Sequence, residues 1–313
     1  MFVNGVPILV TKSRRLQLTT AFGVPDRKEA SLVNGLSKVT KLYKTFGFLV
    51  QKCFADGEFE CLRNQVEGVD LDTAGCSEHV GDIERAIRVL KERIRAIRAS
   101  LPYRRLPRAA IRALAEFVAH WLNSFPAAAG VSRTYSPRSI VTGEVLSQNL
   151  HCRIPFGAYA EVHNDPSPSN DTSVSRTTPA LSLGPLFNQR GTYLFLNLVT
   201  GRVIKRHHWV ELPVTPDVVD RVHALADRDK QPDGLEFADR HGNPAGIGPI
   251  TTFSPPTTHH DISLNPPNVA APFAGAAPAL ADIPEDDNED EDNGDNGDED
   301  EDVTDGGDVA NVN

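Results

Sequence analysis

The chain has 313 residues, of which 40% are hydrophobic, and its 32 Lys and Arg against 42 Asp and Glu give a formal net charge of −10. This length allows one or two domains with hydrophobic cores. No stretch approaches the roughly 18 to 20 apolar residues of a membrane helix. Four widely spaced cysteines without a CxxC pair exclude a zinc finger. Because the first ten residues lack a basic region and a cleavage site, we expect an intracellular protein of the cytoplasm or nucleus that is not secreted.

Charge is divided unevenly along the chain. The last basic residue is Arg240, and 17 acidic residues follow it, whereas residues 1–240 hold all 32 basic residues and 25 acidic ones. The net charge is therefore +7 before this point and −17 after it. Residues 241–313 are rich in Pro, Gly, Ala, Asn and Asp, which leaves too little apolar surface to offset the entropy of ordering. We predict a disordered acidic tail, either a solvating linker or a segment that binds a basic partner.

The first part of the chain has the pattern of an α/β domain. Short apolar runs at 2–10 and 16–22 predict strands, with a tight turn at Asn4-Gly5. Asp26 and Glu29 have the spacing of a capping box, and the helix that they begin ends near Gly47. An apolar strand at 48–55 then ends at Asp56, and a short helical segment at 59–66 precedes a strand at 69–71.

A long helix over residues 83–98 carries two stripes. The apolar stripe repeats at helical spacing and faces a core. The neighbouring stripe places one carboxylate in line with four cations. Its members are Glu84, Arg88, Lys91, Arg95 and Arg98. A second amphipathic helix begins at Pro107 and ends before Pro126.

The second part of the chain has a different pattern. Residues 126–150 are rich in Ser, Pro and Gly and are typical of a connector. Strands are predicted at 154–163, 180–183, 193–198 and 203–210, with a hairpin turn at Thr200-Gly201. They favour a small antiparallel barrel or meander. A last helix is predicted from Pro216 to Ala226.

Asp56 at a strand end and Glu84 on a later helix match what a divalent-metal phosphotransfer site needs. Carboxylates are hard ligands for Mg²⁺ or Mn²⁺, and the neighbouring cations would neutralise nucleic-acid phosphates. The alternative is structural: Asp56 caps a turn, and Glu84 pairs with Arg88 on the helix surface. The cations are equally consistent with a solvated surface.

Several segments then suggest a family. Residues 53–58 read Cys-Phe-Ala-Asp-Gly-Glu, and residues 78–85 read Glu-His-Val-Gly-Asp-Ile-Glu-Arg. Both resemble the second and third catalytic blocks of integrases from copia-type retrotransposon polyproteins. Residues 136–143, Ser-Pro-Arg-Ser-Ile-Val-Thr-Gly, are similar to the element that follows that core. Segments at 156–163, 183–185 and 200–204 resemble the Src-homology-3-like module that comes next.

This resemblance extends over roughly residues 2–227 and implies a domain organisation. Residues 1–125 would form an N-terminally truncated, ribonuclease H-like integrase core of the α/β class. A connector would follow at 126–150, then a small antiparallel Src-homology-3-like β barrel at 151–212. A helix and linker at 213–240 would lead into the disordered acidic C-terminal tail at 241–313.

For function, the resemblance implies DNA integration through metal-dependent phosphodiester cleavage and strand transfer. Asp56 and Glu84 would be the second and third ligands of Mg²⁺ or Mn²⁺. Arg88, Lys91, Arg95 and Arg98 would bind phosphates of double-stranded DNA without sequence specificity. The family's first catalytic Asp precedes a segment like residues 2–5, so we expect an incomplete enzyme. The resemblance leaves a homo-oligomer open.

Two other interpretations remain. The chain is either a non-catalytic nucleic-acid-binding or interaction protein that uses helix 83–98 and the acidic tail, or a remnant without a present role.

Overall fold

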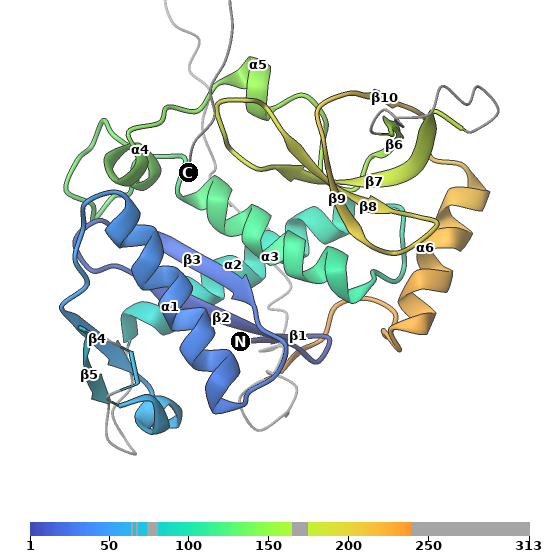
Figure 1. Cartoon of the computed structure of the whole chain (residues 1–313). Coiled ribbons are helices and arrows are strands. Elements are labelled where there is room, and N and C mark those ends of the chain that lie inside the picture. The colour runs from blue at the N-terminus through green and yellow to red at the C-terminus, as the bar shows by residue number, and fades with distance from the viewer. Residues whose placement is uncertain (64, 67, 74–80, 165–174, 239–313) are drawn as a thin grey trace, which may run out of the picture. The chain divides into compact units, whose positions relative to one another are not determined.

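The computed structural model describes residues 1–63, 65–66, 68–73, 81–164 and 175–238, and the predicted disordered tail lies outside them (Figure 1). The described part is a mixed α/β structure, which confirms the predicted class at this coarse level. None of the helices in these ranges is both long and apolar enough to cross a membrane.

The first sheet is an antiparallel meander at the start of the chain. Its strands are β1 (Phe2–Val3), β2 (Val6–Lys12) and β3 (Thr19–Gly23). Asn4 and Gly5 form the predicted turn between the first two strands, with φ of 48° and 70°. Two consecutive positive φ values are what a two-residue type I′ hairpin turn requires.

Helix α1 (Glu29–Thr45) follows the first sheet. The predicted capping box at its start is wrong, because Lys28 and not Asp26 is the N-cap residue. The Asp26 carboxylate instead accepts hydrogen bonds from the backbone N–H of Lys28 at 3.1 Å and from the Ser31 hydroxyl at 2.5 Å. Asp26 therefore still satisfies groups of the first turn, although from outside the helix.

The next two strands do not join the first sheet. β4 (Lys52–Ala55) and β5 (Asp70–Thr73) form a separate parallel pair, and the 3₁₀ helix η1 (Gly57–Leu62) lies between them in the sequence. In the first sheet the order is β11-β1-β2-β3, so the outer neighbour of β1 is the distant β11 (Phe237–Ala238). In a single α/β core the strands β1 to β5 would belong to one sheet, whereas here β4 and β5 form a sheet of their own.

Helices α2 (Gly81–Ser100) and α3 (Arg108–Leu122) pack against each other, and both contribute residues to the largest hydrophobic cluster of the described part. The predicted apolar stripe of α2 is confirmed, since Leu90 and Ile94 are completely buried. The predicted helix α3 is confirmed, and it is buried on more than one side, because Ala113 and Ala115 are buried as well as Ile111 and Leu114. The reason is that α3 packs against β3 on one side and β7 on the other (Figure 1).

A five-stranded antiparallel sheet forms the second part. Its strands are β6 (Tyr159–His163), β7 (Thr177–Pro185), β8 (Tyr193–Asn197), β9 (Val203–Arg206) and β10 (Trp209–Glu211), in the order β10-β6-β7-β8-β9. The predicted strand over 203–210 is divided, because His207 and His208 separate β9 from β10. The predicted barrel is not formed: the sheet is open, with β9 at one end and β10 at the other.

Helices also occur where a plain connector was expected. Residues 126–150 contain α4 (Pro137–Thr142) and the start of α5 (Gln148–His151), and α6 (Pro216–Arg228) confirms the predicted last helix. Helix α4 has the signals of a stable short helix. The Ser136 side chain accepts a hydrogen bond from the backbone N–H of Ser139, and Gly143 ends the helix with a φ of 72°.

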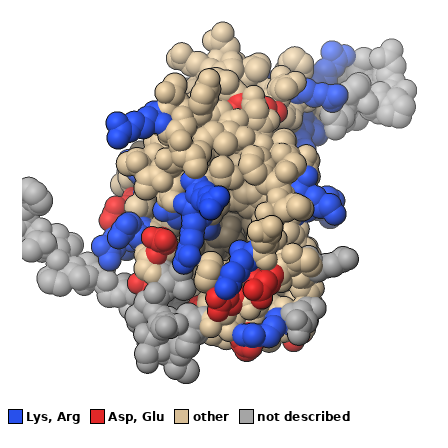
Figure 2. All heavy atoms as spheres, turned by 90° about the vertical axis from the view of Figure 1, so that its left-hand side faces the viewer, with Lys and Arg blue, Asp and Glu red and all other residues tan. Residues whose placement is uncertain are grey.

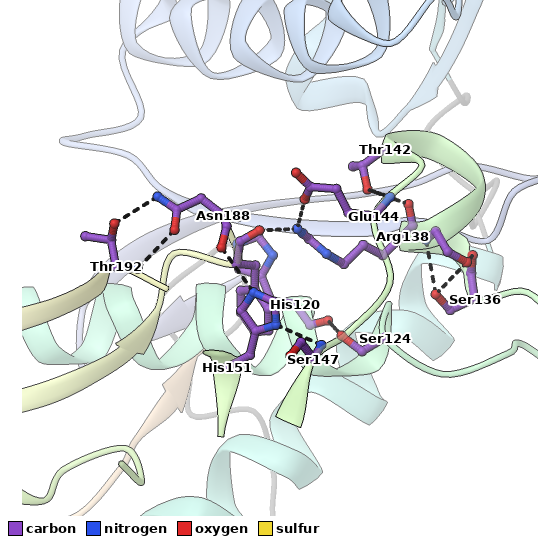
Figure 3. Close-up of polar contacts among 12 residues, drawn as sticks. His120, Ser124, Ser136, Arg138, Thr142, Glu144, Ser147, His151, Asn188 and Thr192 are labelled. Atoms are coloured by element: carbon purple, nitrogen blue, oxygen red, sulfur yellow. Dashed lines mark hydrogen bonds and ion pairs between the residues drawn. The ribbon is translucent and has the colours of Figure 1, made fainter. Parts of the chain in front are cut away.

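Arg138 of α4 connects this segment to the loop between β7 and β8 (Figure 3). Its guanidinium forms an ion pair with Glu144 at 2.6 Å and donates a hydrogen bond to the Phe187 carbonyl oxygen. The rings of His120 and His151 lie 4.9 Å and 5.6 Å from the Phe187 ring. Phe187 has a φ of 53°, which is unfavourable for a bulky residue, so these contacts hold it in place.

The half-buried His120 in this junction makes stability depend on pH. Burial, with a smaller effect of the Arg138 cation, lowers the pKa of His120 from 6.5 to about 4. The pKa of His120 is lower in the folded state than in the unfolded state. The contribution of this group to the free energy of unfolding is therefore complete above the unfolded-state pKa, and it is lost as the pH falls toward the folded-state pKa. We expect the wild type to lose about 2 kcal/mol of unfolding free energy through this group between about pH 7 and pH 5. Urea unfolding at both pH values should show that His120→Phe loses less unfolding free energy than the wild type. Equal losses in the two proteins would contradict this prediction.

Candidate metal and nucleic-acid site

Asp56 lies where the sequence places it, directly after β4. It is the N-cap of η1, and its Oδ1 accepts a hydrogen bond from the backbone N–H of Gly57 at 2.8 Å. The capping role is therefore confirmed. A cap uses one carboxylate oxygen, so it does not prevent this side chain from also binding a cation.

Glu84 lies in the first turn of α2 and is exposed. Together with Asp82 it places negative charge at the positive end of the helix dipole, which stabilises the helix start. Within the described ranges no group of three or more His, Cys, Asp or Glu side chains could hold a metal ion. The assignment of Asp56 and Glu84 as metal ligands therefore stays a prediction.

The loop before α1, the 3₁₀ helix η1 and helix α2 nevertheless come together at the start of β1. Arg27 forms an ion pair with Glu58 of η1 at 2.6 Å, and its guanidinium lies 5.5 Å from the centre of the Phe2 ring. The Met1 α-amino group has its pKa lowered to about 6, first by burial and then by Lys91 and Arg27, while Glu58 opposes this. The turn that follows Asp56 and the middle of α2 thus converge on β1, although β4 pairs with another strand.

The four predicted phosphate-binding cations are not equivalent. Arg88 is exposed on α2. Lys91 and Arg95 lie over the ring of Phe237, at 5.7 Å and 4.6 Å from its centre. Arg98 donates a hydrogen bond to the Arg104 carbonyl oxygen at 2.6 Å. The structure therefore gives three members of the stripe a structural contact, whereas their phosphate-binding role stays a prediction.

Sequence reasoning missed the segment that provides the Phe237 ring. Asn4 donates from its backbone N–H to the Glu236 carbonyl oxygen at 2.8 Å, and its Oδ1 accepts from the Glu236 N–H at 2.6 Å. Its Nδ2 also donates to the Gly234 carbonyl oxygen at 3.1 Å. The alternating apolar residues Leu235 and Phe237 were the available signal, but a two-residue strand is too short to predict from periodicity.

Phe237 should be the main support of this arrangement. It is 5% exposed and belongs to the largest hydrophobic cluster, so Phe237→Ala should lower the free energy of unfolding by about 3 kcal/mol. Phe125, which is 59% exposed, provides a matched control, since Phe125→Ala removes the same atoms from a solvated site. Urea unfolding of both variants measures the difference, and similar losses would show that β11 contributes little.

Comparisons with known proteins add little to these observations. No protein-family model matches the chain, and no curated protein does. Among solved structures, the chain is similar to the catalytic core domain of BIV integrase, with 18% identity and a TM-score of 0.34. The similarity covers 45% of this chain and 88% of that one. Values this low assign no role to any residue of this chain.

Proposed function

We propose that this chain is an integrase-like protein that binds DNA through its phosphates and has at most a very low metal-dependent phosphodiester cleavage activity, because Asp56 and Glu84 are only two of the three carboxylates that such a site uses. The observation that carries the proposal is the position of Asp56 at the end of β4 and of Glu84 in the first turn of α2. A ribonuclease H-like core of the copia type, which the sequence resembles, places two of its carboxylates at such positions. The convergence of η1 and α2 on the start of β1 supports this arrangement.

The donor chemistry of the two carboxylates fits the proposed ion. Mg²⁺ prefers oxygen ligands and is commonly bound through one or two carboxylates together with substrate phosphates. When bound, the metal would neutralise the charge that develops on the phosphate. Asp56 and Glu84 would fix its position, and Arg88 would bind a neighbouring phosphate. Metal binding by these two side chains should therefore strengthen when DNA is present.

The test is nicking of a labelled duplex in Mg²⁺ and in Mn²⁺. Asp56→Asn and Glu84→Gln should abolish metal-dependent nicking, because each replaces a charged ligand by a weak neutral one. Asp82→Asn is the matched control, since Asp82 is an exposed carboxylate in the same helical turn as Glu84. Nicking that survives both ligand substitutions would reject this assignment.

The competing function is non-catalytic nucleic-acid binding through α2, and the exposed Arg88 favours it. Duplex binding that weakens steeply above about 50 mM salt, without nicking in either metal, would support this second function. Arg88→Gln should then reduce the salt slope by about 0.9. A chain that does not bind duplex DNA at low salt has neither function.

A further inference from the structure

A second surface with the features of a nucleic-acid site lies on β4, and it was not found from the sequence. Side chains on β4 alternate between exposed and half-buried positions, so Lys52 and Phe54 share the outer face. Cys53 and Ala55 point the other way and pack against a hydrophobic cluster. Phe54 is 41% exposed, so part of its side chain is accessible to a binding partner.

Two cations frame this ring. The Arg14 guanidinium lies 4.0 Å and the Lys52 ammonium 5.0 Å from the centre of the Phe54 ring. We call these three side chains, together with the adjacent Arg15, the Phe54 platform. Arg14 and Arg15 belong to the turn between β2 and β3. An arginine stacked on an aromatic ring presents its other face to solvent, where a base can stack on it.

The turn that carries Arg14 is well fixed. The backbone N–H of Leu18 donates to the Ser13 hydroxyl and the Ser13 N–H donates to the Leu18 carbonyl oxygen, both at 2.9 Å. The Gln17 side chain donates to the Arg14 carbonyl oxygen at 2.6 Å. Because this backbone is held, little entropy is lost when the Arg14 side chain binds a partner.

The charge of the platform favours a polyanion. Asp72 forms an ion pair with Lys52 at 2.8 Å and neutralises it. Among the described residues no carboxylate forms a salt bridge with Arg14 or Arg15, so these two carry the uncompensated positive charge. Figure 2 views the side of the molecule that carries β4 and β5, where Lys and Arg side chains lie near the centre with Asp and Glu side chains beside and below them.

We propose that the Phe54 platform binds single-stranded nucleic acid, with one base stacked on the outer face of the Arg14 guanidinium, which itself lies on the Phe54 ring, and with the adjoining phosphates held by Arg15 and by the N–H edge of Arg14. Stacking on this pair of side chains requires an unpaired base, which a duplex does not offer. Lys52 and Phe54 of the platform lie on β4, and Asp56 directly follows this strand. Unpaired bases would therefore be held beside the candidate carboxylate, although binding itself requires no metal.

The test is fluorescence anisotropy with a labelled oligothymidylate of about 20 nucleotides, in the absence of divalent metal. Phe54→Leu keeps an apolar side chain but removes the aromatic face, and it should weaken binding about tenfold. Phe54→Trp keeps the face and should bind at least as tightly as the wild type. Phe125→Ala is the control for the loss of an exposed ring elsewhere, and it should leave binding unchanged.

The charge contribution is tested separately. Arg14→Gln should reduce the slope of log affinity against log salt by about 0.7, the value for one phosphate contact on a single strand. Arg133→Gln removes the same charge from another exposed position and should leave the slope unchanged. Thermal melting shows that each variant is folded. Equal effects of Phe54→Leu and Phe54→Trp, or of Arg14→Gln and Arg133→Gln, would overturn the proposal.

A further experiment tests whether the Phe54 platform binds an acidic polypeptide in place of nucleic acid. A labelled peptide of residues 282–308 tests whether the surface instead takes an acidic polypeptide. If this peptide binds equally to the wild type and Phe54→Leu while the oligothymidylate does not bind, the platform is a charge site for protein and the proposal is wrong. Oligothymidylate binding is measured without divalent metal, whereas nicking requires it, so failure of the proposed metal chemistry is distinguished from failure of the platform.

Discussion

The packing of two sheets on one helix is the constraint on which the described structure depends. Helix α3 lies between the first sheet and the five-stranded sheet, and it can do so because its surface is apolar and small on most sides. Each of the two sheets has a glycine where it packs closely against α3. A Cβ atom at Gly23 of β3 would collide with the Arg112 side chain, and one at Gly184 of β7 would collide with Phe117. Gly184 also has a φ of 95°, a conformation that other residues rarely adopt.

This constraint explains why the two halves of the sequence share a core. The largest hydrophobic cluster includes Val6 of β2, Leu114 of α3, Leu181 of β7 and Val222 of α6. The Tyr103 hydroxyl, from the loop between α2 and α3, donates to the Gly157 carbonyl oxygen at 2.9 Å, so a polar contact crosses the same boundary. The alanines of α3 therefore do more than raise helix propensity: they set how closely both sheets can pack.

Local features of the fold were predictable, and long-range pairings were not. The Asn4-Gly5 turn, the stripe of α2 and the strand that ends at Asp56 follow from residue types at short spacing. The open five-stranded sheet and the separate β4–β5 pair depend on which strands meet, and a periodic pattern carries no information about its partner strand.

Likewise the sequence identified Lys91 as a cation on an exposed stripe. Its contact with Phe237 depends on a segment about 146 positions away, which helix periodicity cannot reveal.

The division of charge along the chain affects both cationic surfaces. A polyanion in the same chain as a cationic surface competes with nucleic acid for that surface, and 17 carboxylates follow Arg240 in this sequence. Stacking at Phe54 is less affected by this competition, because residues 282–308, which hold 16 of the 17 acidic residues, contain no aromatic side chain. An aromatic contact therefore allows a surface of low net charge to select nucleic acid over an acidic polypeptide, which charge alone cannot do.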